Sequence, residues 1–288
     1  MSGRLYSVMG NSQKLDGGAM FGNAPKAMWE RWAPPDAHNR IDLACRTLLI
    51  RDGGSTVLLE AGVGAFFPPK LRARFGINEP HHVLIDNLSA LDLTDADVDV
   101  VILSHLHFDH AGGLMSTWSK ECDPVLLFPN AEFVVGKTAW DRACSPHRRD
   151  KASFIPAINR ALEQSGRLSF IEDERHAALG PRFRFHESNG HTPGMMLTEI
   201  ETRQGPIVFG ADLIPGRPWV RGAITMGYDR YPELLIDEKV RLLDRLVDEQ
   251  GSVFFTHDPQ CAMARIIRDA RGRFDVTDEH QTLHGLAC

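Results

Sequence analysis

The feature that most constrains the fold of this sequence is a histidine-rich turn that directly follows an apolar segment. Residues 98–103 are mostly apolar and end at Ser104, which is typical of a strand buried on both faces. Within the next six residues the chain carries three histidines and one aspartate: His105, His107, Asp109 and His110. Imidazole and carboxylate groups are the usual protein ligands of zinc and similar divalent cations. The pattern therefore predicts a β-sheet whose strand end carries a metal site.

The spacing of these residues allows one short turn to reach two metal positions. Alternate residues of an extended segment point to the same side, so His105 and His107 should face one point. The start of a following helix would turn Asp109 and His110 toward a second point, and Gly112-Gly113 permits close backbone packing there. So short a turn cannot complete two coordination spheres, and further ligands must come from elsewhere.

Candidates for the missing ligands follow other segments that resemble strands. His191 lies in a Gly-His-Thr-Pro-Gly turn, Asp212 follows the apolar residues 207–209, and His257 follows residues 253–256. Functional residues gather at strand ends in open α/β sheets. We therefore expect these side chains to meet those of the histidine-rich turn.

Hydrophobic patterning predicts alternating strands and helices. The expected strands are residues 41–50, 56–60, 98–103, 124–128, 132–135, 167–171, 182–187, 195–201, 207–209 and 253–256, with a last hairpin formed by 264–269 and 273–276. An Asp52-Gly53-Gly54 turn should join the first two strands. The expected helices are residues 69–75, 82–91, 152–164 and 233–250.

The predicted helix at residues 233–250 is the clearest, with one apolar stripe and charged residues opposite. The stripe is Ile236, Val240, Leu243 and Val247. Because strands and helices interleave without a separate block or linker, the predicted class is α/β or mixed α+β, with residues 1–288 as a single domain.

Composition limits the partners that this chain can have. The formal net charge of −6 disfavours a nucleic-acid partner, which requires a basic surface. No stretch approaches the ~20 apolar residues of a membrane helix, and residues 1–13 lack a signal-peptide core. The five cysteines are widely spaced, which favours free thiols in a reducing compartment. We therefore expect a cytoplasmic protein with a small-molecule substrate, no membrane partner, and a homodimer as a candidate assembly.

Together, the ordered motifs resemble those of the metallo-β-lactamase superfamily. The motifs are His-x-His-x-Asp-His at 105–110, Gly-His-x-Pro-Gly at 190–194, Gly-x-Asp at 210–212 and a late strand ending in His257. The resemblance implies a four-layer αββα sandwich and two divalent ions per chain. Zinc is the expected metal, with manganese, iron or cobalt as alternatives. It also implies that His105, His107 and His191 hold one ion, that Asp109, His110 and His257 hold the other, and that Asp212 bridges them.

This resemblance implies a hydrolase in which a metal-bound hydroxide attacks the substrate. Asp109 and Asp212 would orient and tune the site, and Asp258 or Ser104 could orient ligand imidazoles or serve only as turn residues. His107 stands where flavo-di-iron proteins carry Glu, and the full ligand set differs from the reduced set of persulfide dioxygenases. A metal-binding sensor without catalysis and an iron redox enzyme are alternative hypotheses.

The flanking segments resemble the quorum-quenching lactonases and their organophosphate-hydrolysing relatives. They are residues 16–22, 40–50 and 226–232. The predicted activity is therefore hydrolysis of lactones or related esters, with phosphotriester, arylester or glyoxalase-II-type thioester hydrolysis as alternatives. N-acyl homoserine lactonases typically carry a tyrosine three residues after the bridging aspartate, and Pro215 stands at that position here.

Large apolar residues in predicted loops suggest a hydrophobic substrate pocket. The candidate substrate-binding residues are Met20, Phe21, Phe66, Phe67, Trp219, Met226 and Tyr228. Tyr228 or Tyr231 could supply the hydroxyl that Pro215 lacks, with a packing role as the alternative for either residue. Subunit contact or core packing is the competing interpretation for this set.

Overall fold

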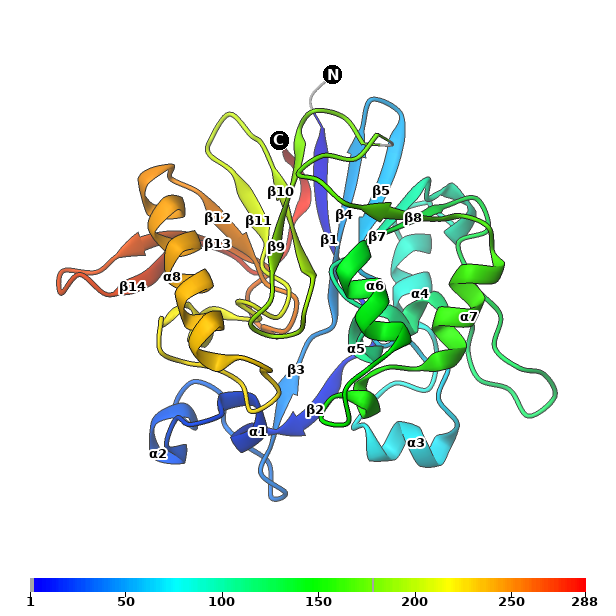
Figure 1. The fold of residues 1–288 in the computed structure, drawn as a ribbon, viewed down its shortest axis with the longest axis horizontal. Coiled ribbons are helices and arrows are strands. Elements are labelled where there is room, and N and C mark those ends of the chain that lie inside the picture. The colour runs from blue at the N-terminus through cyan, green and yellow to red at the C-terminus, as the bar shows by residue number, and fades with distance from the viewer. Residues whose placement is uncertain (1–2, 178) are drawn as a thin grey trace.

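In the residues that the computed structural model describes, 3–177 and 179–288, two large β-sheets pack face to face and helices cover their outer faces (Figure 1). The first sheet has the strand order β15-β1-β4-β5-β6-β7-β8 and the second has the order β14-β13-β12-β11-β10-β9. Helices α4, α6 and α7 lie beside the first sheet and α8 lies beside the second (Figure 1). The arrangement is the predicted αββα sandwich.

The strands and helices have the following bounds. The first sheet contains β1 (Arg4–Met9), β4 (Arg46–Asp52), β5 (Ser55–Leu59), β6 (Val100–Leu103), β7 (Glu132–Gly136), β8 (Leu168–Ile171) and β15 (His284–Ala287). The second contains β9 (Phe183–Ser188), β10 (Met195–Ile200), β11 (Ile207–Phe209), β12 (Ser252–Phe254), β13 (Met263–Arg268) and β14 (Phe274–His280). A small separate sheet pairs β2 (Gln13–Asp16) with β3 (Arg40–Leu43). The α-helices are α1 (Gly17–Phe21), α2 (Lys26–Trp29), α3 (Pro69–Arg74), α4 (Val83–Ser89), α5 (Phe108–Ala111), α6 (Lys137–Cys144), α7 (Pro156–Gln164) and α8 (Pro232–Asp248), and short 3-10 turns are η1 (Asp95–Asp97), η2 (Gly112–Leu114), η3 (Lys151–Ser153) and η4 (Arg217–Val220).

The alternation of side chains along the first sheet explains why its strands are apolar on both faces. In β6, Val100 and Ile102 belong to the core between the sheets, whereas Val101 and Leu103 pack into the core formed with the helices. Successive side chains of a strand point to opposite faces, so a sheet covered on both sides requires apolar residues throughout. β5, β6, β7 and β8 are also parallel neighbours, which brings their carboxyl ends to one edge.

Most predicted elements are present, and three predictions are wrong in part. The expected strand at residues 41–50 is divided between β3 and β4, which lie in different sheets. The break falls at Ala44, whose N–H donates to the His257 carbonyl and whose carbonyl lies 2.7 Å from His257 Nδ1. The backbone there bonds to a loop of the other sheet, so it cannot continue the ladder.

Residues 124–128 do not form the expected strand. Their pairing is limited to an isolated bridge between Leu126 and Met115. Pro124 and Pro129 flank the segment and lack the N–H that a ladder needs, and Phe128 has a left-handed φ of 57°.

The buried face of α8 differs from the predicted stripe. The helix buries Leu235, Lys239, Leu242, Leu243 and Leu246. Ile236, Val240 and Val247 are only half-buried. The row 235, 239, 242 and 246 has helical spacing of its own, and a lysine with a long apolar stem occupies one of its core positions. None of the described helices combines the length and apolar content that a membrane span requires.

We predict that Glu199 stabilises the second sheet in a pH-dependent manner. Its buried carboxylate lies 2.8 Å from His186 Nε2 and 2.5 Å from Arg245 Nη2 of α8. Burial raises the pKa of Glu199, but these two partners outweigh burial and lower the pKa to about 2. The folded-state pKa is thus depressed, so the stabilisation is present above the unfolded pKa near 4.5 and is lost as pH falls toward about 2.

Replacing Glu199 by Gln should therefore lower the free energy of unfolding by about 2–3 kcal/mol at pH 7, and by progressively less below pH 4.5. Chemical unfolding at a series of pH values measures this difference. The control is Glu201→Gln, because Glu201 pairs with Arg175 on the surface. An equal loss at all pH values for Glu199→Gln would contradict the prediction.

Candidate metal centre

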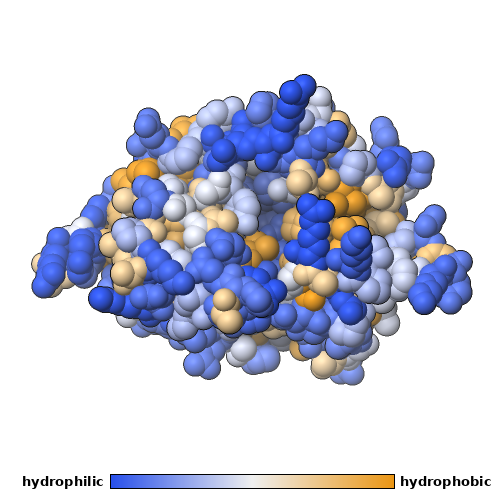
Figure 2. Space-filling view, turned by 90° about the horizontal axis from the view of Figure 1, so that it is seen from below, coloured by the Kyte–Doolittle hydropathy of each residue, from blue (hydrophilic) through white to orange (hydrophobic). Residues whose placement is uncertain are grey.

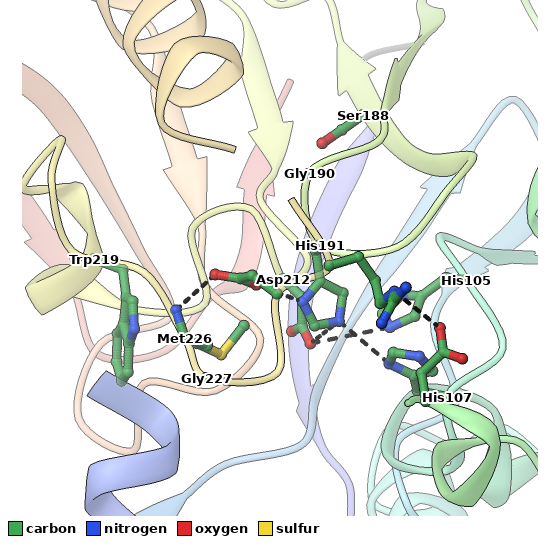
Figure 3. A network of polar contacts seen from close by, with 12 residues as sticks. His105, His107, Ser188, Gly190, His191, Asp212, Trp219, Met226 and Gly227 are labelled. Carbon is green, nitrogen blue, oxygen red and sulfur yellow. Dashed lines mark hydrogen bonds and ion pairs between the residues drawn. The ribbon is translucent and has the colours of Figure 1, made fainter. Parts of the chain in front are cut away.

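The seven predicted ligands converge at one edge of the two sheets. The turn that follows β6 of the first sheet carries His105 and His107. Helix α5, which comes next, carries Asp109 and His110. The second sheet contributes residues that follow β9, β11 and β12: His191, Asp212 and His257. Figure 3 shows His105, His107, His191 and Asp212 pointing toward one another from these elements.

One group of four side chains could hold a metal ion at the end of the first turn. His105, His107, His191 and Asp212 each offer a ligand atom, and these atoms lie within 4.8 Å of one another. His191 Nε2 is 3.2 Å from His107 Nδ1 and 3.1 Å from Asp212 Oδ2, while His105 Nε2 is 4.0 Å from the same oxygen.

A second group lies on the other side of the Asp212 carboxylate. Asp109, His110 and His257 offer ligand atoms within 4.8 Å of one another. Asp212 Oδ1 is 3.3 Å from His110 Nε2 and 3.2 Å from His257 Nε2, whereas Oδ2 faces the first group. The two oxygens of Asp212 thus face different groups, as a bridging carboxylate requires.

Neighbouring groups hydrogen-bond to the outer nitrogens of three imidazoles, and the Glu60 carboxylate lies near the outer nitrogen of a fourth without a hydrogen bond to it. The outer contacts are His105 Nδ1 to Ser104 Oγ at 2.9 Å, His110 Nδ1 to Glu60 Oε2 at 3.3 Å, His191 Nδ1 to Asp229 Oδ1 at 2.8 Å, and His257 Nδ1 to the Ala44 carbonyl at 2.7 Å. An acceptor on one ring nitrogen fixes the tautomer and directs the lone pair of the other nitrogen. In each of these rings Nε2 is left facing the centre.

The donor atoms at the centre fit divalent cations. The inner Nε2 atoms of His105 and His110 and Oδ1 of Asp212 are buried and have no hydrogen-bond partner. Buried polar atoms are normally satisfied, so this cluster of acceptors calls for a positive group. A tetrahedral zinc with ligands at about 2.0–2.1 Å separates its ligand atoms by roughly 3.3 Å. The closest distances here, 3.1–3.3 Å, match that separation.

Burial and mutual charge set the protonation of the centre. Burial lowers the pKa of His105 and His107 well below the ordinary value, so both imidazoles are neutral. Burial also opposes charge on His110 and His257, but the Asp212 carboxylate outweighs it and raises the pKa of both. Burial raises the pKa of Asp212, yet the charges of His110, His191 and His257 bring it well below the usual range.

Sequence reasoning missed two acidic residues that support this centre. Glu60 follows β5 with a left-handed φ of 68°, contacts His110, and accepts from the Ser104 N–H at 2.8 Å. Asp229 holds His191 from the loop before α8. Neither has the motif spacing of a ligand, although Asp229 could have been found as the one acidic residue of the loop at 224–232.

Of the two residues predicted to orient ligand imidazoles, Ser104 contacts one and Asp258 does not. Ser104 contacts the His105 ring directly. Asp258 is occupied instead by Arg217, whose Nε lies 2.8 Å away, and by the N–H groups of Gln260 and Cys261. Asp258 therefore shapes the turn after β12 and does not contact a ligand imidazole.

A cavity of about 180 Å³ opens onto the centre. The ligands His107, Asp109, His191, Asp212 and His257 lie on its floor. Its walls are Leu15, Met20, Phe75, Phe108, Ala152, Ser153, Met226 and Tyr228. Three of the seven candidate substrate-binding residues are thus on the wall: Met20, Met226 and Tyr228.

The other four candidates lie in cores that do not line this cavity. Phe66 and Phe67 contact each other with tilted rings whose centroids are 4.1 Å apart, and they pack with Phe75 in the core on the helical side of the first sheet. Phe21 and Trp219 stack at 4.6 Å in a separate cluster with Trp29. These aromatic rings are buried against other aromatic rings. The sequence alone cannot distinguish an aromatic residue packed in this way from one that lines a substrate pocket.

Comparison with known proteins agrees with this geometry. Residues 40–257 match the profile of the Metallo-beta-lactamase superfamily, and the chain belongs to that superfamily. Among the relatives, an N-acyl homoserine lactonase of Bacillus thuringiensis is 26% identical over 177 residues, which are 61% of this chain and 62% of that protein. The match thus spans less than two thirds of the lactonase.

Solved structures share the fold over nearly the whole chain. A probable metal-dependent hydrolase from Staphylococcus aureus superposes with a TM-score of 0.85 and 26% identity, covering 96% of this chain and 98% of that one. AidC, described as a dizinc quorum-quenching lactonase in complex with a product, superposes with a TM-score of 0.73 and 22% identity, covering 96% of this chain and 95% of that one.

We predict that zinc binding at pH 7 releases protons from the metal-free protein. Because Asp212 raises the pKa of His110 and His257 well above the ordinary value, these rings hold protons at neutral pH that coordination must displace. Calorimetric titration with Zn²⁺ in two buffers of different ionisation enthalpy measures the release, expected at about one to two protons per chain. Replacing His257 by Ala should reduce the number of protons released. Equal observed binding enthalpies in the two buffers would mean that no protons are released and would refute the prediction.

Proposed function

We propose that this chain is a dinuclear-metal hydrolase that opens lactones or cleaves related neutral esters. The observation that carries the proposal is the pair of ligand groups at the floor of a cavity with apolar walls. The superfamily match and the lactonase relatives support the reaction class. We propose zinc as the resident ion; a cytoplasmic location, a homodimer, the lack of a nucleic-acid partner and the single-domain extent of residues 1–288 stay predictions from the sequence.

The residues present define how such a centre operates. Two divalent ions bound there lower the pKa of water and polarise the substrate carbonyl. Asp212 and the two histidine groups fix the separation of the positions, and Ser104, Glu60 and Asp229 hold the ligand rings in register. The floor is almost completely buried, which strengthens electrostatic interactions with charge that develops on the substrate.

The cavity wall favours a substrate that carries no negative charge beyond the scissile group. No lysine or arginine belongs to the lining of the cavity among the described residues, so its walls offer no positively charged side chain. A β-lactam carboxylate or an anionic thioester would find no cationic partner on this wall. Thioesterases of the glyoxalase-II type follow the sandwich with a basic helical segment. Residues 263–280 instead form the predicted hairpin, now β13–β14, which further weakens the thioesterase alternative.

Tyr228 places a hydroxyl group at the cavity that could hydrogen-bond to the alcohol oxygen released from an ester substrate. Pro215 has none, but Tyr228 lines the same cavity as Asp109 and Asp212. Burial, together with the Asp109 and Asp16 carboxylates, raises the pKa of Tyr228, so its O–H keeps its proton at neutral pH. We propose that Tyr228 donates a hydrogen bond to the substrate oxygen.

Phosphotriester and arylester hydrolysis is the second candidate. The same cation-free wall accepts neutral aryl phosphotriesters and aryl esters as well as lactones. Rates on lactones, aryl phosphotriesters, aryl esters and thioesters, compared side by side, rank these activities.

We predict that lactone hydrolysis depends on bound metal and on the bridging carboxylate. Chelation should reduce turnover to background and Zn²⁺ should restore it, because the residues on the cavity floor are all predicted metal ligands. Asp212→Ala should abolish turnover, whereas Asp237→Ala, which removes an exposed aspartate of α8, should leave it unchanged. Full activity in protein shown by elemental analysis to be metal-free would reject the proposal.

We also predict a limited gain from lengthening the acyl chain. The cavity of about 180 Å³ is smaller than the roughly 300–1,000 Å³ typical of sites for drug-sized ligands. Each buried methylene contributes about 0.8 kcal/mol, so kcat/KM should rise about three- to fourfold per methylene until the chain reaches the mouth, and then level off. The face of the molecule seen in Figure 2 is mostly hydrophilic with small separate hydrophobic patches.

A pair of methionine variants tests this size limit. Met226→Ala enlarges the cavity and should move the plateau to longer chains. Met28→Ala removes a methionine that is 45% exposed and should not move it. A plateau at the same chain length in both variants would show that Met226 does not bound the substrate.

A further inference from the structure

Arg46 is an arginine in the core of the protein. It is the first residue of β4 and is only 3% exposed, whereas Arg51 near the other end of the same strand is exposed. Arginine is almost never fully buried unless its guanidinium group is paired, because leaving water costs free energy that hydrogen bonds must replace. The burial of Arg46 therefore depends on the groups that its nitrogens contact.

The side chain of Arg46 reaches into the loop between β12 and β13 of the other sheet. Its Nη1 donates to the main-chain carbonyls of Phe255 at 2.9 Å, Asp258 at 2.8 Å and Cys261 at 3.1 Å. The base of the loop is closed by a hydrogen bond from the Phe255 N–H to the Ala262 carbonyl at 2.8 Å. Charge-assisted hydrogen bonds are stronger than neutral ones, so the guanidinium holds three carbonyls of one loop around a single point.

The loop that Arg46 fills carries His257, one of the predicted metal ligands. His257 lies in sequence between the first two of the three bonded carbonyls. Its Nε2 is 3.2 Å from Asp212 Oδ1 and 3.8 Å from Asp109 Oδ2. Metal–ligand distances in proteins hold to about 0.2 Å, so even a small shift of the loop backbone weakens coordination by His257.

Main-chain bonds hold only one side of this loop. The Ala44 carbonyl lies 2.7 Å from His257 Nδ1, and the Ala44 N–H donates to the His257 carbonyl at 3.1 Å. The Arg46 N–H donates to the Thr256 carbonyl at 2.9 Å. These bonds do not involve the side chain at position 46 and remain when it changes. The two bonded carbonyls that follow His257 in the loop accept from the Arg46 side chain.

We propose that Arg46 is a positioning residue of the metal centre, which orders the loop at 255–262 so that His257 Nε2 faces its ligand group. The inference rests on the proposed function, because it assigns His257 to a bound ion. Arg46 acts through the backbone of the loop, and neither side chain gains or loses a proton in this role. Loss of the guanidinium should therefore weaken the ion held by His257 and leave the ion of the other group unchanged.

The decisive experiment measures the affinity of each ion. Arg46→Met keeps an unbranched apolar side chain but removes the three hydrogen bonds, and Arg51→Met removes an exposed arginine from the same strand. Competition with a chromogenic chelator gives the two Zn²⁺ affinities, and the visible spectrum of the Co²⁺-loaded protein reports the ligand geometry. We expect Arg46→Met to weaken one ion about 10- to 100-fold and to leave the other unchanged, with Arg51→Met like wild type at both.

His257→Ala identifies the ion on which Arg46 acts. Loss of this ligand should weaken the same ion and change the same Co²⁺ absorption band as Arg46→Met. The double variant Arg46→Met/His257→Ala should bind the remaining ion as tightly as His257→Ala does, because Arg46 acts only through His257. A further loss at the remaining ion would mean that Arg46 supports the sandwich as a whole, and would overturn the proposal.

A lysine variant keeps the proposal testable even when Arg46→Met folds poorly. Arg46→Lys retains a cation with three N–H donors, but one flexible ammonium group reproduces the contacts of a planar guanidinium only in part. We expect a loss of about three- to tenfold at the ion of His257 and none at the other ion. Equal losses at both ions, or wild-type affinities in a variant that is less stable to chemical unfolding, would show a structural role alone.

The outcomes distinguish this inference from the proposed function. Wild-type protein that binds no metal overturns both. Wild-type protein that binds two ions and hydrolyses lactones, together with Arg46 variants that have the affinities and Co²⁺ spectrum of Arg51→Met, overturns the role of Arg46 alone.

Discussion

The Asp212 carboxylate is the interaction around which this site is organised. It is buried between two groups of imidazoles, with one oxygen facing each group. A carboxylate in such a place is stable only beside positive charge, which protonated histidines or bound cations can supply. The strand ends of both sheets, the turn after β6 and the first turn of α5 all bring ligands to this one anion. Outside the ligands, a further layer of groups contacts four of the five ligand imidazoles.

The ligand set could be predicted because its residues have a chemical identity and a spacing that do not depend on packing. Three histidines and an aspartate in one turn after a buried strand form a typical set of donors for divalent cations. The supporting groups could not be predicted in the same way. Ser104 stands beside a ligand in the sequence, whereas Glu60 and Asp229 are distant in sequence from the rings that they hold. Their role exists only in three dimensions.

The fold shows a similar division. Strands that are apolar on both faces, such as β6 and β11, and the glycine turn at Gly53 and Gly54, with φ of 62° and 95°, follow from local rules. Strand β1 and the edge strand β15 do not follow from such rules, because they pair across the whole length of the chain. The apolar stripe predicted for α8 did not include Lys239, which is buried and donates a hydrogen bond to the Ile224 carbonyl.

The ligands come from both halves of the sandwich, and this has a mechanical consequence. His105, His107, Asp109 and His110 belong to one half, while His191, Asp212 and His257 belong to the other. Ions bound by all seven residues would link the two layers, which otherwise contact each other through apolar side chains. An ion that binds only the native state adds about 4 kcal/mol when its concentration is a thousandfold above Kd. If the chain binds such ions, its free energy of unfolding depends on the concentration of free metal, and loss of the ions removes a link between the two layers.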